Sequence, residues 1–131
     1  MAHKRDIFIN INKNGLKWGF FAHHIKEGEM VSTFIPAFDL YYSSPNKDEA
    51  NKRAKIMVKS FLNFWIQQQG FRAFVLQMLK LGFKTPDATA LKQLLERKNI
   101  NAKLSASNTN IPDEFLEAET FLQEDQMEVA V

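Results

Sequence analysis

The sequence predicts an α+β fold: a small antiparallel sheet in β-β-β-α order, with a long helix packed on one face and a helical C-terminal region. Two patterns predict it. Residues 7–22 alternate apolar and polar side chains around an Asn-Gly pair, and residues 46–69 repeat apolar side chains at intervals of three and four. With 131 residues and 45% hydrophobic side chains, the chain is long enough for one domain with a modest core.

Residues 7–22 are expected to form a β-hairpin. The Asn14-Gly15 pair favours a two-residue type I′ turn, and with that loop Ile11 lies opposite Trp18. Alternation then places six side chains on one face, and a slip of one residue would send half of them to the other face. These six are Ile7, Ile9, Ile11, Trp18, Phe20 and Ala22.

Further strands are expected after the hairpin. Residues 23–29, which include two adjacent histidines, are polar and predict a loop. Residues 30–35 are apolar and β-branched enough for a short strand, which Pro36 ends. Aromatic and aliphatic side chains alternate with others over residues 38–42, which predicts another strand. Three or four antiparallel strands are therefore expected before the helix.

A long helix is expected to follow the strands. Asn46 and Glu49 have the spacing of an N-cap residue and its reciprocal partner, and Gly70 marks a natural end. One stripe of this helix is apolar, so we expect it to lie on the sheet. The opposite side carries three lysines with an arginine on the flank: Lys52, Lys55, Lys59 and Arg53.

The C-terminal part is expected to be mostly helical. Its patterns predict helices at 71–81 and 86–98 and an added strand at 100–106. From Pro112 we expect an acidic helix that ends in a frayed tail. The predicted units are a domain with a helical extension over residues 1–106 and the acidic helix and tail over residues 107–131.

The charge is divided between two segments of opposite sign. Residues 1–103 hold all 17 Lys and Arg and eight of the 15 acidic residues, whereas the last 28 residues hold the other seven and no basic residue. The main body is therefore suited to a polyanion or an acidic protein surface. The alternative is that both segments are ordinary solvated faces. A third expectation is that the acidic tail folds back over the basic body when no partner is present.

Several functional classes are excluded or unsupported. The chain has no cysteine, which removes disulfides, thiol nucleophiles and Cys-ligated metals, and it has no glycine-rich phosphate loop or paired carboxylates on rigid elements. His23 and His24 are adjacent and would point to opposite sides of an extended chain, so we expect no metal site and no cofactor. No signal peptide or membrane span is visible, and a cytoplasmic protein without enzymatic activity is expected.

Two groups of residues are candidates for binding. Phe8, Phe21 and Tyr41 fall on the outward side of their strands and would form an apolar surface for a protein partner or for homo-oligomer formation. Lys52, Arg53, Lys55 and Lys59 would contact an acidic partner or a phosphate backbone. Residues 71–98 also have a helix-turn-helix-like succession, but the second helix displays a mixed set of polar residues.

Residues 7–65 resemble the HicB-like antitoxin family. The matching stretches are IFININKNGLKWGFF, FIPAFDLYYSS and PNKDEANKRAKIMVKSFLNFW. Glu49-Ala50 matches the start of the family's helix, Gly-Asp-Thr-x-Glu-Glu-Ala, whereas Ser44-Pro45 replaces the usual Gly. The resemblance implies a β-β-β-α-β protein that binds and neutralises a small RNA-cleaving toxin and often dimerises. It also implies repression of its own promoter through an attached DNA-binding segment, which residues 70–131 do not match.

The most favoured function from sequence is therefore non-catalytic binding, as an antitoxin-like protein or a small adaptor that engages a protein partner. The alternative is a nucleic-acid-binding protein, similar to a transcriptional regulator, that uses the basic helix face.

Overall fold

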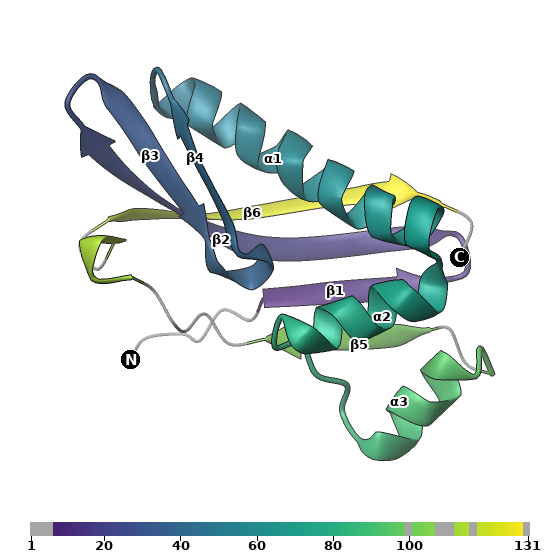
Figure 1. Cartoon of the computed structure of the whole chain (residues 1–131). Coiled ribbons are helices and arrows are strands. Elements are labelled where there is room, and N and C mark those ends of the chain that lie inside the picture. The colour runs from purple at the N-terminus through teal and green to yellow at the C-terminus, as the bar shows by residue number, and fades with distance from the viewer. Residues whose placement is uncertain (1–6, 99–100, 107–111, 116–117, 130–131) are drawn as a thin grey trace.

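The computed structural model describes residues 7–98, 101–106, 112–115 and 118–129. It is a mixed α+β protein in which helices cover one face of an antiparallel sheet (Figure 1). The strands are β1 (Ile7–Asn12), β2 (Gly15–Glu27), β3 (Met30–Ile35), β4 (Leu40–Ser44), β5 (Ala102–Ala106) and β6 (Glu119–Glu128). The α-helices are α1 (Lys47–Phe64), α2 (Phe71–Lys80) and α3 (Ala88–Leu95); η1 (Pro36–Phe38) and η3 (Asp113–Phe115) are 3-10 turns, and η2 (Trp65–Gln69) is a π-helix.

Strand β2 is the longest strand and the one to which three others attach. Residues 15–19 pair with both β1 and β6, and residues 23 and 24 pair with both β3 and β6. Because a strand has only two edges, β1 and β3 follow one another along one edge of β2, and β6 lies on the other. β4 then pairs with β3, and β5 with β1.

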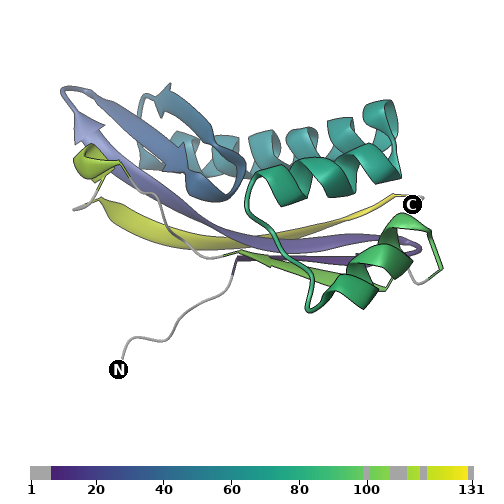
Figure 2. The same ribbon diagram turned by 60° about the horizontal axis from the view of Figure 1, so that its bottom comes forward.

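Helices α1 and α2 lie over one face of this sheet, whereas α3 lies beyond β5 (Figure 2). The six side chains that sequence alternation assigns to one face are all buried beneath this helix layer, which confirms that prediction. The same core includes three side chains of α1 with no exposed surface, Ala54, Val58 and Leu62. Burial of apolar surface between the two layers forms the core.

The hairpin register differs from the predicted one by two residues. The loop is Lys13 and Asn14, Asn12 pairs with Gly15, and Ile9 lies opposite Trp18. The shift is an even number, so the buried face stays the same. Gly15 has another role than the turn, because a Cβ at this position would lie 2.2 Å from the carbonyl oxygen of Met127 in β6.

The predicted polar loop at residues 23–29 is wrong. β2 continues through Glu27, and only Gly28 and Glu29 form the turn, with Gly28 at φ +62°. Both histidines are within the strand and are 3% exposed. Their backbone groups pair with β3, which follows directly after the turn, and with β6, which lies about one hundred residues later. This pairing makes the segment a strand although its side chains are mostly polar.

The predicted acidic C-terminal helix is also wrong. Among the described residues after β5, only Asp113–Phe115 is helical, as a single 3-10 turn, and Glu119–Glu128 form a strand that pairs with β2 over ten residues. Without β6, the second edge of β2 would expose a long row of unpaired backbone groups. Backbone hydrogen bonding to this distant edge therefore makes the segment a strand.

The other predicted elements agree more closely with the structure. Asn46 caps α1, its side chain accepting a hydrogen bond from the Glu49 N–H at 2.9 Å, and the helical run continues as a π-helix to Gln69. Four strands precede α1, and β4 begins only at Leu40 because η1 occupies residues 36–38. The strand expected at 100–106 is β5. No helix in the described ranges combines the length and apolar character needed to cross a membrane.

Replacing Gly15 by Ala is expected to destabilise the fold by about 1–3 kcal/mol, because the new methyl group must push β6 away from β2. Urea unfolding of both proteins measures this difference. Asn14→Ala, in the adjacent exposed turn, is the control and should change the free energy of unfolding by less than about 0.5 kcal/mol. Equal stability of Gly15→Ala and the wild type would contradict the close approach of the two strands.

Candidate functional site

A cleft of about 710 Å³ lies where β2 and β3 extend past the N-terminus of α1. Val31 and Pro45 supply apolar surface, and two lysines and two glutamates supply charges of both signs. His24 also lines the cleft. The lining residues are His24, Ile25, Lys26, Glu29, Val31, Pro45, Asn46, Lys47 and Glu119.

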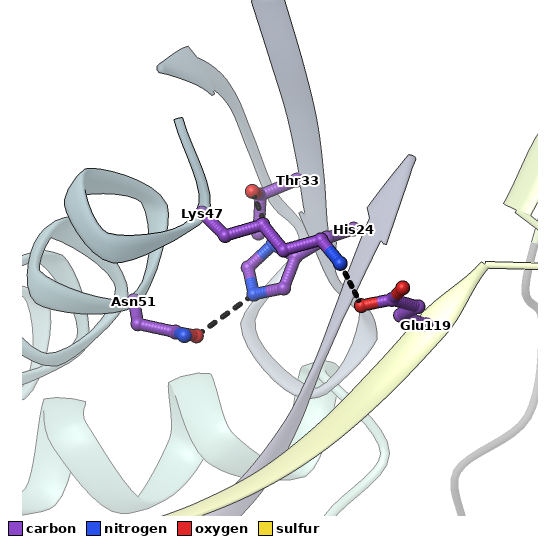
Figure 3. Close-up of polar contacts among 5 residues, drawn as sticks. All are labelled: His24, Thr33, Lys47, Asn51 and Glu119. Atoms are coloured by element: carbon purple, nitrogen blue, oxygen red, sulfur yellow. Dashed lines mark hydrogen bonds and ion pairs between the residues drawn. The ribbon is translucent and has the colours of Figure 1, made fainter. Parts of the chain in front are cut away.

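His24 is hydrogen bonded at both ring nitrogens, as Figure 3 shows. Nδ1 lies 2.7 Å from the hydroxyl of Thr33 in β3, and Nε2 lies 2.9 Å from Oδ1 of Asn51 in α1. The same Oδ1 accepts a hydrogen bond of 3.0 Å from Nε2 of Gln123 in β6. Because Oδ1 can only accept, Nε2 of His24 carries the proton and Nδ1 accepts from Thr33. The neutral imidazole is thus fully satisfied.

Further contacts surround this network. The Phe121 ring of β6 lies 5.3 Å from the His24 ring, between ring centroids, and Lys47 forms an ion pair with Glu119 at the mouth of the cleft (Figure 3). Tyr42 of β4 donates a 2.6 Å hydrogen bond to the carbonyl of Ala50. Burial raises the pKa of Tyr42 to about 12, so it remains a donor at neutral pH. Side chains of β2, β3, β4, α1 and β6 therefore meet at one place.

The ionisation of His24 is suppressed by its position. Burial lowers its pKa below 6.5, and this outweighs the opposing effects of the Asn51 hydrogen bond and the Glu119 carboxylate; Lys47 adds to the lowering. A neutral imidazole whose two nitrogens are already bonded lacks a free position for a substrate proton. In the described part of the chain, no three His, Cys, Asp or Glu side chains lie close enough to hold a metal ion. The hydrogen bonds of His24 connect β2 to β3 and to α1.

The three aromatic candidates all lie on the sheet face opposite α1. Phe8 packs over Gly19, where a Cβ would lie 2.6 Å from the ring, and Phe21 is the diagonal neighbour of Phe8 on the same face. Tyr41 is 54% exposed and makes an edge-on contact with Phe115 of η3, at 5.9 Å between ring centroids. Phe8 and Phe21 are thus adjacent, whereas Tyr41 lies farther along the face, at its η3 end.

The four basic candidates are all exposed on α1, but they are not equivalent. Arg53 donates a 2.9 Å hydrogen bond from Nη1 to the carbonyl oxygen of Ser43, at the outer edge of β4. Lys52 lies 3.9 Å from Glu49, one turn earlier. Lys55 and Lys59 have no ion pair among the described residues, and Ile56, 64% exposed, lies between them in sequence.

The polar network around His24 was not predicted from the sequence. One signal was available: His24 continues the alternation of Trp18, Phe20 and Ala22, which places its side chain toward the helix. The identity of the other network residues gave no such signal, because Asn51 and Gln123 are 27 and about one hundred residues away from His24 in the chain.

The comparisons with known proteins give no family assignment. No protein-family model matches the chain, and searches of the curated proteins and of the solved structures found no match. The resemblance to the HicB-like family therefore stays a prediction.

Asn51→Ala is expected to cost about 2–4 kcal/mol of stability, because it leaves the buried donors of His24 and Gln123 without their shared acceptor. Asn63→Ala, at an exposed position of the same helix, is the matched control and should cost less than about 0.5 kcal/mol. Thermal or urea unfolding separates the two variants. Similar losses in both would show that the network contributes little.

The stability of the protein is expected to fall as the pH drops below 6.5. The pKa of His24 is lower in the folded protein than in the unfolded chain, so the unfolded chain takes up the proton first as the pH falls. Protonation therefore stabilises the unfolded chain relative to the folded protein until the pH falls below the folded pKa. For one proton the slope is at most about 1.4 kcal/mol per pH unit. His24→Gln should flatten this part of the profile. An NMR titration of His24 with a midpoint above 6.5 would contradict the sign.

Proposed function

We propose that this chain is a non-catalytic binding protein, antitoxin-like or a small adaptor, which engages a protein partner through the sheet face opposite α1. The observation that carries the proposal is the common face of Phe8, Phe21 and Tyr41. Phe8 and Phe21 are half-buried, the Lys103 ammonium lies 5.9 Å from the centroid of the Phe8 ring, and Phe115 of η3 lies against Tyr41. Aromatic side chains on an open sheet face provide the apolar centre that protein interfaces use.

The arrangement of charges favours a protein partner over nucleic acid. Arg53 is engaged with the edge of β4, Lys52 lies near Glu49, and the exposed Ile56 interrupts the basic row. A phosphate backbone would be better served by an unbroken row of free cations. The HicB-like resemblance suggests a small ribonuclease toxin as the partner class, and a second copy of this chain is the other protein that the aromatic face would accept.

A photo-crosslinking amino acid placed at Tyr41 tests the proposal in the native cell. Tyr41 is half exposed, so the change leaves the core intact, and irradiation should yield covalent adducts with one discrete protein. The same amino acid at Ile56, more exposed but on the outer face of α1, is the control and should yield none of that adduct. Adding Phe21→Ser should reduce the Tyr41 adduct about tenfold or more, as expected for a central interface aromatic.

Crosslinking and a separate DNA-binding measurement distinguish a protein partner, a homo-oligomer and a nucleic acid. Adducts only at Ile56 would contradict the aromatic face, and an adduct with twice the mass of the chain would identify a homo-oligomer. Tight binding of random duplex DNA that weakens steeply with added salt would support the nucleic-acid function instead, whereas absence of binding at low salt removes it.

A further inference from the structure

The free edge of β6 has a defined set of outward backbone groups. The N–H of Val129 donates to the carbonyl of Asn14 at 3.0 Å, and these residues continue the β2–β6 register by one position. In an antiparallel ladder, hydrogen-bonded pairs alternate with pairs that point away. The backbone groups of odd-numbered residues in β6 therefore face β2, and those of even-numbered residues face outward: Thr120, Leu122, Glu124, Gln126 and Glu128.

The sheet has two other outer edges, and each has a contact on its outward side. At β4, Arg53 donates to the outward carbonyl of Ser43. At β5, Ser105 exchanges two backbone hydrogen bonds with Lys84, at 2.8 and 2.9 Å. At β6, only the N–H of Gln126 is occupied, by the side chain of Asp125 at 2.8 Å. The outward backbone groups of residues 120–124 have no partner among the described residues, so this edge is open to another strand.

The side chains along this edge are acidic. Glu124 and Glu128 are exposed, lie on the open face of the sheet and form no ion pair with any described residue, including Lys17 on the neighbouring strand. β6 contains no basic residue, so pairing with β6 of a second copy would bring like charges together, which is unfavourable. A strand with lysine or arginine on the same face would instead find opposite charges.

We propose that the free edge of β6 accepts an extended, cationic segment of the partner protein as an additional antiparallel strand. The segment would hydrogen bond to residues 120–124 and place its cations beside Glu124 and Glu128. This deepens the proposed binding function, on which it rests, by naming how and by what chemistry the partner attaches. The mode is strand addition, in which backbone bonds supply affinity and alternate side chains supply selectivity.

A ten-residue peptide of alternating lysine and threonine, with blocked ends, serves as the probe for the whole chain in solution. Amide exchange by NMR should slow about fivefold or more at Leu122 and Glu124 when the peptide is added, because these amides gain partners. The amides of Phe121 and Gln123 already face β2 and should not change. This alternation is a signature that simple charge attraction does not produce.

Two N-methylated peptides of equal charge test the backbone contact. Residues opposite one another in a hydrogen-bonded pair share a face, so the peptide residues that bond to β6 are the ones whose side chains lie beside Glu124, the lysines. N-methylation of alternate lysines should abolish the protection, whereas N-methylation of alternate threonines should leave it. Equal effects of both peptides, or none, would overturn the proposal.

A pair of protein variants tests the charge contribution. Glu124→Gln with Glu128→Gln should weaken binding of the peptide about fivefold at low salt. Glu27→Gln with Asp39→Asn removes the same charge at exposed positions outside β6 and should leave affinity unchanged. Equal weakening by both pairs, or protection of Leu122 and Glu124 in a dimer without peptide, would contradict the proposal. Alternating protection together with failed crosslinking at Tyr41 would refute the proposed aromatic face and leave the β6 edge standing.

Discussion

The pairing of β6 with β2 is the contact on which the rest of the structure depends. β2 offers β6 a ten-residue edge, and the last strand of the chain fills it. The fit is close enough that Gly15 has no room for a side chain. The same pairing brings Gln123 to Asn51 and Glu119 to Lys47, so the C-terminal strand completes the polar network around His24. Pairing of β6 with β2 therefore both closes the sheet and adds Glu119 to the cleft.

Sequence patterns predicted the parts of the fold that local physics decides. Alternation located the buried face of the hairpin, and the Asn46 cap located the start of α1, because both signals lie within a few residues of the element they describe. The predicted hairpin register was wrong because an Asn-Gly pair is typical of a turn, whereas Gly15 instead allows the close approach of Met127. The C-terminal helix failed for a related reason: its strand conformation is imposed by an edge about one hundred residues earlier.

The same division holds for the candidate sites. Alternation was enough to place Phe8, Phe21 and Tyr41 on the face opposite α1, although it gave no indication that Phe115 would lie against Tyr41. The side chain of His24 also follows the alternation, but its hydrogen-bond partners come from β3 and α1, and Gln123 of β6 bonds to the same Asn51. A buried polar group is stable only with complete partners, and that completeness is a property of the tertiary fold. Sequence alternation therefore predicts which face of the sheet a side chain lies on, whereas its hydrogen-bond partners are known only from the tertiary structure.

The position of β6 also changes the meaning of the acidic C-terminal segment. As a tail it would be free to fold over the basic body, but as a strand it holds its charges along one edge of the sheet. Among the described residues, the one ion pair between this strand and α1 joins Glu119 to Lys47. The remaining charges are left for solvent or a partner, and like charges along an open edge oppose pairing with a second copy. The acidic side chains thus disfavour pairing with a second copy, while the backbone groups of this edge stay available to a strand of opposite charge. In this way the edge can remain open without promoting aggregation.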